Sequence, residues 1–133
     1  MRRVAIDAGS WLGNISAAQA LLAPSFVGRL VETCFVLLLD QEHCLIAQLI
    51  IDAIEPGTVD LPFRKIVTEA LASDTRAMIL AHNHPDGDPT PSMADKLATR
   101  RLAEVAAPLG LRLLDHLIFA DDAFISFHAL GLL

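Results

Sequence analysis

The most informative stretch of this chain lies at positions 81–95 and reads AHNHPDGDPTPSMAD. It follows a short apolar run, residues 77–81, of the kind that forms a central strand covered on both sides. Residues 85–91 hold three prolines and two aspartates, which predicts an ordered loop and excludes helix or strand. Ser92 then begins a helix, because Ser-x-x-acid is the capping box of a helix start. A strand, a stiff loop and a helix therefore follow one another here.

Toward the N-terminus, apolar patterning predicts a hairpin and two helices. Residues 33–39 and 44–51 are rich in Val, Leu and Ile and flank a polar turn, which is typical of a β-hairpin. We expect a helix over residues 16–30 with a break before Pro24, because the residue preceding a proline resists the helical region. Pro62 is well placed in the first turn of a second helix that runs to about residue 72.

Toward the C-terminus, strands are expected over residues 111–120 and 124–127. Gly57 and Thr58 mark a loop. The helix that Ser92 begins should turn one apolar stripe to the core, made of Ala94, Leu97, Ala98, Leu102, Val105 and Leu109. The order of elements predicts an α/β fold of the α+β kind, with helices against a mixed sheet. We assign all 133 residues to one domain, since two domains would each be unusually small.

Composition and charge limit the classes of function. Apolar residues make up 53% of the chain, but charged and amide side chains interrupt the richest segment, residues 35–54, so we expect buried strands and no membrane span. The N-terminus has two arginines without a signal-peptide apolar run, which points to a cytoplasmic protein. The net charge of −6 argues against non-specific nucleic-acid binding, which draws on clustered Lys and Arg. Whether the chain forms a homodimer stays open.

The two cysteines are predicted to be free thiols. Cys34 and Cys44 lie on the two arms of the expected hairpin, and a turn centred near residues 41 and 42 pairs Cys44 with Leu39. The two sulfur atoms then cannot face each other. Free thiols also agree with a reducing compartment.

Three side chains around the quoted stretch are candidate metal ligands. His82 and His84 lie two apart at a strand end, so both rings leave on one face with Cα atoms roughly 6 to 7 Å apart. The stiff loop can return Asp95 to the same point. Two histidines, one carboxylate and an open position are the pattern of catalytic zinc. Taken alone, Ser92 and Asp95 are explained better as a plain capping box, and the conjunction with the histidines favours a metal.

This spacing resembles the JAMM signature of the JAB/MPN family. His-x-His, seven residues, Ser, two residues and Asp match His82, His84, Ser92 and Asp95 at every position. The quoted stretch is similar to the version of the motif in RadC proteins, and FVLLLDQEHCLIA and LLDHLIFADDAFISF resemble their first hairpin and closing segment. The resemblance implies a cytidine-deaminase-like JAB/MPN fold, with an N-terminal helical segment over 1–31 and a JAMM core over 32–133.

The resemblance also implies what these residues do. His82, His84 and Asp95 would hold Zn²⁺. Glu32 occupies the position of the family's upstream glutamate and would take a proton from the attacking water and pass it to the leaving amine. Ser92 would help to hold the oxyanion. The chain is then a zinc-dependent hydrolase, a metallopeptidase or isopeptidase acting on a peptide or protein substrate.

Two other functions remain open at this point. One is a zinc hydrolase that acts on a phosphodiester, as the DNA-repair association of RadC proteins implies, although the negative charge disfavours it. The other is a non-catalytic interaction module that keeps its metal, although a structural zinc needs a fourth protein ligand. His116 follows Asp115 in a strand and is expected to be either a partner of the ligands or a hydrogen-bonded core histidine. His43 and His128 are expected at the surface.

Overall fold

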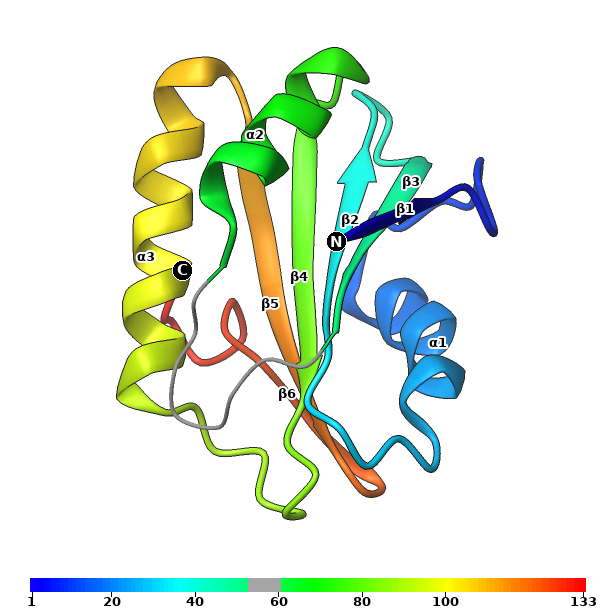
Figure 1. Ribbon diagram of the computed structural model, residues 1–133, viewed down its shortest axis with the longest axis vertical. Coiled ribbons are helices and arrows are strands. Elements are labelled where there is room, and N and C mark those ends of the chain that lie inside the picture. Colours follow the sequence, from blue (N-terminus) through cyan, green and yellow to red (C-terminus); the bar gives the residue numbers. More distant parts are fainter. Residues whose placement is uncertain (53–60) are drawn as a thin grey trace.

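The computed structural model describes residues 1–52 and 61–133, and a six-stranded sheet forms its centre (Figure 1). The strand order is β1-β3-β2-β4-β5-β6. Neighbouring strands pair antiparallel except β4 and β5, which are parallel, so the predicted mixed, mainly antiparallel sheet is confirmed. The strands are β1 (Arg2–Val4), β2 (Cys34–Leu39), β3 (Leu45–Ile51), β4 (Ala77–Asn83), β5 (Arg112–Ala120) and β6 (Ala123–Ser126). The loop expected at Gly57-Thr58 lies outside the described residues.

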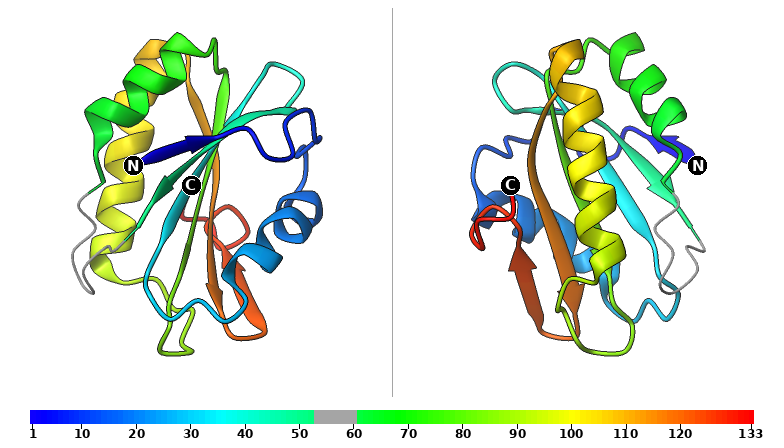
Figure 2. Two further views of the ribbon diagram at one scale, coloured as in Figure 1. Left: turned by 45° about the vertical axis from the view of Figure 1, so that its right-hand side comes forward. Right: turned by 90° about the vertical axis from the view of Figure 1, so that its left-hand side faces the viewer.

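Helices cover both faces of this sheet. Figures 1 and 2 show α1 (Ile15–Phe26) on one face and α2 (Phe63–Ala72) with α3 (Met93–Ala106) on the other. Helix α3 connects the parallel strands β4 and β5, which is the usual way to join parallel neighbours. The first residues of α3 therefore lie near the carboxyl end of β4.

Strand β2 shows why both faces need cover. All six of its residues are buried, and they alternate between two apolar cores. Val36 and Leu38 pack toward α2 and α3, whereas Phe35 and Leu37 pack toward α1. An uninterrupted apolar run is the pattern expected of such a central strand.

Two expectations about the helices were wrong. Helix α1 does not break before Pro24 but ends two residues later at Phe26. Phe26 is buried against the rings of Phe35 and Phe119, at centroid distances of 5.2 and 4.8 Å, and this packing holds the last turn. Pro24 removes one helical N–H donor, and only Ser25 and Phe26 follow it in the helix.

The predicted apolar stripe of α3 is only partly right, because Ala98 and Leu102 are buried as expected and three other members are exposed. Leu97, Val105 and Leu109 are 56%, 43% and 44% exposed, whereas Asp95 and Thr99 are 1% exposed. The capping box at Ser92 fixes the start of the helix, and polar contacts to the sheet fix its rotation. Asp95 and Thr99 therefore face the sheet, where the apolar periodicity predicted Leu97 and Val105.

The register of the β2–β3 hairpin differs by one residue from the expected one. Leu39 pairs with Leu45, not with Cys44, and the ladder shifts between Leu38 and Leu39. Within the turn, one carboxylate oxygen of Asp40 accepts hydrogen bonds from two backbone N–H groups. Both cysteines are free, as predicted, because Cys34 pairs with Ile51 at the other end of the hairpin. None of the described helices is long and apolar enough to cross a bilayer.

Candidate metal centre

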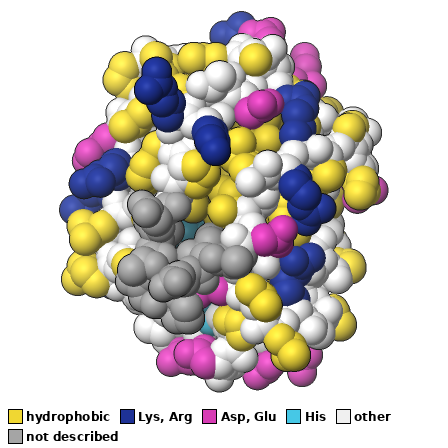
Figure 3. Space-filling model, in the orientation of Figure 1, with side chains coloured by type: hydrophobic (Ala, Val, Ile, Leu, Met, Phe, Trp, Pro, Cys, Tyr) yellow, Lys and Arg dark blue, Asp and Glu magenta, His cyan; other side chains and the backbone are white. Residues whose placement is uncertain are grey.

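Four side chains converge at the carboxyl end of β4. One donor atom from each of Glu32, His82, His84 and Asp95 lies within 4.8 Å of the others. The group is largely withdrawn from solvent, with side-chain exposures of 12%, 5%, 14% and 2% in that order. Figure 3 shows histidine and acidic side chains reaching the surface together in the lower half of the molecule. The structure thus brings together all three predicted ligands and the glutamate fifty residues away in sequence.

Secondary structure places each member of this group. His82 lies near the end of β4, and the backbone N–H of His84 continues the ladder by donating to the carbonyl of Phe119 at 2.8 Å. Cys34 pairs with His82 in the β2–β4 ladder, which brings Glu32 alongside the histidines. Asp95 is the third residue of α3 and is turned inward by the capping box. Strand alternation puts these side chains on the face that α3 covers.

The loop between β4 and α3 fixes the ring of His84. Nδ1 of His84 lies 2.8 Å from the backbone carbonyl of Asp88, and a carbonyl can only accept, so Nδ1 carries the hydrogen. The Asp88 carboxylate in turn accepts hydrogen bonds from the N–H and hydroxyl of Thr90. Gly87 has φ 88°, and a Cβ there would stand 2.7 Å from a carboxylate oxygen of Asp121. Because the Asp88 carbonyl holds Nδ1 of His84, Nε2 of the same ring points into the site.

Two ring nitrogens and a carboxylate face one another in the centre. Nε2 of His82 lies 2.9 Å from Nε2 of His84. The Asp95 carboxylate lies 3.3 Å from the first nitrogen and 3.2 Å from the second. Two nitrogen lone pairs cannot face each other at this distance without a proton or a cation between them. Two imidazoles and a carboxylate are ligands that fit Zn²⁺.

Electrostatics in the centre reflect this arrangement. The hydrogen bond with Asp95 raises the pKa of His84 against the opposing effect of burial, with help from the Asp88 carbonyl. Burial alone would raise the pKa of Asp95, but hydrogen bonds from His82 and His84 outweigh it and lower that pKa far below its ordinary value. Without metal, His84 therefore binds a proton at Nε2 more readily than a free imidazole does.

A second histidine stands behind His82. Nδ1 of His82 lies 2.7 Å from Nε2 of His116, and Nδ1 of His116 lies 2.6 Å from the hydroxyl of Thr99. Burial, followed by repulsion from His82, lowers the pKa of His116 well below its ordinary value, so this ring is neutral. His116 is therefore a buried core histidine that also hydrogen-bonds a predicted metal ligand.

Glu32 lies beside the histidines but belongs to the segment before β2, outside the sheet. Its carboxylate is 3.8 Å from Nε2 of His82. Burial raises its pKa, and the nearby histidines only partly offset this. The side chain of Asn83 accepts from the N–H of Thr33 at 2.7 Å and donates to the carbonyl of Val31 at 3.1 Å, so it grips the chain on both sides of Glu32. Sequence reasoning gave Asn83 no role.

Comparison with known proteins agrees with this geometry. Residues 12–132 match the family model of the RadC-like JAB domain. The chain belongs to the RadC-like JAB domain family. It is similar to a UPF0758 protein of Rhodobacter capsulatus, with 43% identity over 90% of this chain and 57% of the relative. It is also similar to UPF0758 proteins of Symbiobacterium thermophilum (35%, covering 92% and 52%) and Coxiella burnetii (38%, covering 98% and 58%). The chain thus spans little more than half the length of these relatives.

Membership of the RadC-like family and the four-residue group together support a metal-dependent hydrolase. The predicted RadC-type JAB/MPN relationship and fold are confirmed. Ser92 caps α3: its hydroxyl oxygen accepts from the N–H of Asp95 at 3.0 Å, and its own N–H donates to that carboxylate at 2.8 Å. The capping box and the metal cluster are therefore compatible, because one carboxylate takes part in both.

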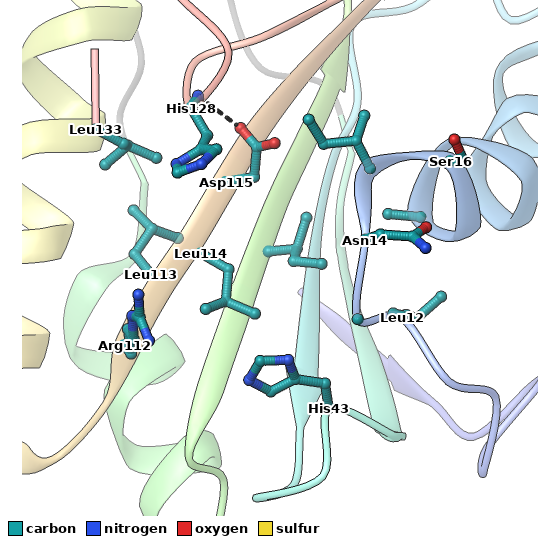
Figure 4. A pocket seen from close by; sticks show the side chains of 14 residues that line it. Leu12, Asn14, Ser16, His43, Arg112, Leu113, Leu114, Asp115, His128 and Leu133 are labelled. Carbon is teal, nitrogen blue, oxygen red and sulfur yellow. Dashed lines mark hydrogen bonds between the residues drawn. The ribbon is translucent and has the colours of Figure 1, made fainter. Parts of the chain in front are cut away.

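The adjacent residues Asp115 and His116 act on opposite faces of this RadC-like fold. His116 faces α3, whereas Asp115 accepts hydrogen bonds from the hydroxyl of Ser126 and the N–H of His128. Asp115 also borders a cavity of about 760 Å³ between α1 and β5, in which Figure 4 shows His43, Arg112 and Leu133. Of the two histidines expected at the surface, His128 is exposed and His43 is half-buried. Asp115 therefore anchors the C-terminal turn and does not reach the metal centre.

A second cavity, of about 730 Å³, borders the metal centre at His84. The segment after α1 and the β5–β6 turn form its two sides. Phe119 and Phe124 supply apolar surface, and Asp121 and Asp122 supply acidic groups. Of the four-residue group, His84 alone lines this cavity.

Proposed function

We propose that this protein is a zinc-dependent hydrolase that cleaves an amide bond, as a metallopeptidase or an isopeptidase. The observation that carries the proposal is the 2.9 Å separation of the two Nε2 atoms beside the Asp95 carboxylate. Both Nδ1 atoms have hydrogen-bond partners of their own, so both Nε2 atoms remain available to a cation. Three protein ligands and an open position are what catalytic zinc requires.

In this proposal His82, His84 and Asp95 hold the ion and Glu32 moves the proton. Bound zinc polarises a carbonyl oxygen and makes water nucleophilic at neutral pH. Glu32 accepts a proton from the attacking water and delivers it to the nitrogen of the leaving amine. Its raised pKa suits both steps, because the carboxyl must release the proton as readily as it takes it.

Ser92 is proposed to stabilise the oxyanion. Its oxygen accepts the N–H of Asp95, which fixes the hydroxyl at the start of α3. The hydroxyl hydrogen can then donate to the carbonyl oxygen of the substrate as negative charge develops there. The side chain is exposed at the rim of the site and so can reach a substrate.

The surroundings favour an amide over a phosphodiester. Asp86 and Asp88 are exposed on the loop that carries His84, and Asp121 and Asp122 line the adjoining cavity. The whole chain carries a net charge of −6. A polyanionic substrate would meet like charge on this approach, whereas a peptide would not. We therefore assign a peptide or protein substrate and not a nucleic acid.

The decisive experiment separates a general base from a fourth ligand. Zinc content and zinc affinity are measured for the wild type, Glu32→Gln and His84→Ala, together with hydrolysis of a peptide mixture, ε-linked lysine isopeptides and bis(p-nitrophenyl) phosphate. If Glu32 is the base, Glu32→Gln keeps its zinc and loses turnover by roughly 10² to 10⁴. His84→Ala should lose zinc and turnover together, while the exposed Glu42→Gln serves as the control.

Other outcomes would refute parts of the proposal. A large loss of zinc affinity in Glu32→Gln would make Glu32 a fourth ligand, and the site would then be structural. Cleavage of the phosphodiester alone would exclude the amide assignment. Iron in place of zinc after expression in metal-replete medium would change the metal, since two histidines and a carboxylate also bind Fe(II).

A further inference from the structure

We propose that Thr99 and His116 form a relay that fixes the ring of His82 in the tautomer that a metal ion requires. The inference rests on the proposed function, in which Nε2 of His82 binds zinc. A ligating histidine commonly donates its other N–H to a carboxylate, a carbonyl or water, which are ready acceptors. Here the acceptor is a second imidazole, which accepts at Nε2 only while its own hydrogen is on Nδ1.

Thr99 decides where that hydrogen lies. Its hydroxyl is 2.7 Å from the backbone carbonyl of Asp95 and 2.6 Å from Nδ1 of His116. A hydroxyl has one hydrogen, and the carbonyl can only accept, so the hydroxyl donates to Asp95. Its oxygen is then left to accept, and Nδ1 of His116 must donate to it. Nε2 of His116 becomes an acceptor, and Nδ1 of His82 donates.

The opposite assignment fails at a definite contact. If the hydroxyl of Thr99 donated to His116, its oxygen and the carbonyl oxygen of Asp95 would stand 2.7 Å apart with no hydrogen between them. The hydrogen of His116 would then lie on Nε2 and that of His82 on its own Nε2. That hydrogen would point at His84, and His82 could not bind a metal.

The relay joins two ligands through the protein interior. It runs from the backbone of Asp95 through Thr99 and His116 to His82, and these four residues are each at most 4% exposed. Since water does not reach these groups, no solvent molecule can replace a missing partner. The same helix that supplies the Asp95 carboxylate therefore also orients the imidazole of His82.

The test compares Thr99→Val with Thr99→Ser. Valine matches the shape of threonine without its hydroxyl, so His116 loses the acceptor at Nδ1 and its hydrogen can move to Nε2. We expect zinc affinity, measured by competition with a chromophoric chelator, to fall by roughly 10- to 100-fold. Serine restores the hydroxyl and should return the affinity to within about threefold of wild type. Thr68→Val is the matched control, because Thr68 makes the same hydroxyl-to-carbonyl bond in α2 with no histidine beside it.

A second readout requires neither metal nor turnover. Proton–nitrogen correlation spectra of the metal-free wild type report which nitrogen of His82 carries hydrogen, and we expect Nδ1. In Thr99→Val the hydrogen should move toward Nε2. A wild-type spectrum with the hydrogen on Nε2 overturns the relay even if Thr99→Val does not fold. So does a Thr99→Val protein with unchanged tautomer and unchanged zinc affinity.

The two proposals can fail separately. A wild type with the expected tautomer and zinc affinity but no amide hydrolysis would refute the proposed function and leave the relay standing. A wild type that hydrolyses amides with His82 in the other tautomer would refute the relay alone. Wild-type protein without zinc affinity would refute the proposed function, while the tautomer of His82 would still decide the relay.

Discussion

The two parts of the site are held in place by different means. His82 and Asp95 belong to β4 and α3, and His84 is tied to β5 by a backbone hydrogen bond, so regular structure positions the ligands. Glu32 belongs to residues 29–33, before β2, where Leu30 and Val31 are 86% and 55% exposed. Apolar burial does not hold this segment. Its position instead depends on hydrogen bonds, chiefly those of Asn83.

This difference implies that metal binding and turnover can be broken independently. Changes to His82, His84 or Asp95 should remove the metal, and changes that loosen residues 29–33 should displace the base while the metal stays. Residues 29–33 should also be locally less stable than the strands, because a segment with few buried contacts opens more easily than strands in the core.

The largest expected effect follows from Asp95→Asn. Asparagine keeps the size and the capping hydrogen bonds but removes the charge that both histidines face. Zinc binding should fall below detection in a chelator competition. Because the folded pKa of Asp95 is depressed, its carboxylate stabilises the fold above the unfolded pKa, near 3.8, and this stability is lost only as pH falls through the lower folded value.

At pH 7 we therefore expect metal-free Asp95→Asn to lose about 1.5 to 3 kcal/mol in urea unfolding, as for hydrogen bonds to a charged group. Asp121→Asn is the matched control, since this exposed turn residue has φ 49°, which asparagine tolerates. Unchanged zinc affinity in Asp95→Asn would show that the aspartate only caps the helix.

A smaller effect, confined to turnover, is expected of Asn83→Ala. The change releases the N–H of Thr33 and the carbonyl of Val31, so Glu32 can drift from the histidines. A displacement of about 1 Å can cost roughly 10² in rate, whereas zinc affinity should stay within about threefold. Steady-state kinetics and the chelator competition separate the two.

The control for Asn83→Ala is Asn14→Ala. Asn14 caps α1 on the opposite face of the sheet, and its loss should cost about 1 kcal/mol of stability with no change in turnover. If both variants lost turnover equally, general destabilisation would be the cause. Asn83 would then have no specific role in positioning Glu32.

The same contrast explains how much the sequence could predict. The ligands were accessible because His82 and His84 share a strand and Asp95 begins the next helix, so spacing alone constrains them. Glu32 was not, because fifty residues and a hairpin separate it from His82, and only the family resemblance located it. Strand β1 was missed because its three residues are too short to show alternation.

The buried polar residues were harder to predict from the sequence. The apolar pattern of α3 favoured Leu97 and Val105 as core positions, yet Asp95 and Thr99 face the sheet because hydrogen bonds select that rotation. One signal was present: Thr99 stands four residues after Asp95, on the same side of a helix. The contact of Thr99 with His116 on β5 could be recognised only in the folded chain.

The third effect is a dependence of zinc affinity on pH. Because the pKa of His84 is raised, the metal must displace a proton from that ring below this pKa. The dissociation constant should rise by up to about tenfold for each pH unit of further acidification, since one proton leaves for each ion. Calorimetry in buffers of different ionisation enthalpy counts the protons released.

Stability of the metal-free protein should follow the opposite trend. The raised pKa of His84 stabilises the fold below the unfolded value, near 6.5, and this contribution is lost as pH rises through the folded value. The zinc-induced rise in Tm should therefore grow from pH 6 to pH 8. His128→Asn, on an exposed turn, should leave both trends unchanged. A zinc affinity independent of pH would mean that no proton occupies the site.

The smallest effect tests whether residues 29–33 open before the strands do. Cys34 directly follows this segment, and burial, with the nearby Glu32 and Asp95, raises its pKa to about 12, so its thiol should react with alkylating reagents only when the chain opens. The half-buried Cys44 should react first, and intact mass without reductant should show no loss of two hydrogens. At about 0.5 kcal/mol for each of the two hydrogen bonds that Asn83 makes to Val31 and Thr33, losing both raises the open population about fivefold. Asn83→Ala should speed labelling of Cys34 by that factor and leave labelling of Cys44 unchanged. Asn14→Ala should change the labelling of neither cysteine. Equal labelling rates of Cys34 in wild type and Asn83→Ala would mean that β2 itself must open before the thiol reacts. Local opening of residues 29–33 could then not explain why turnover and metal binding are lost independently.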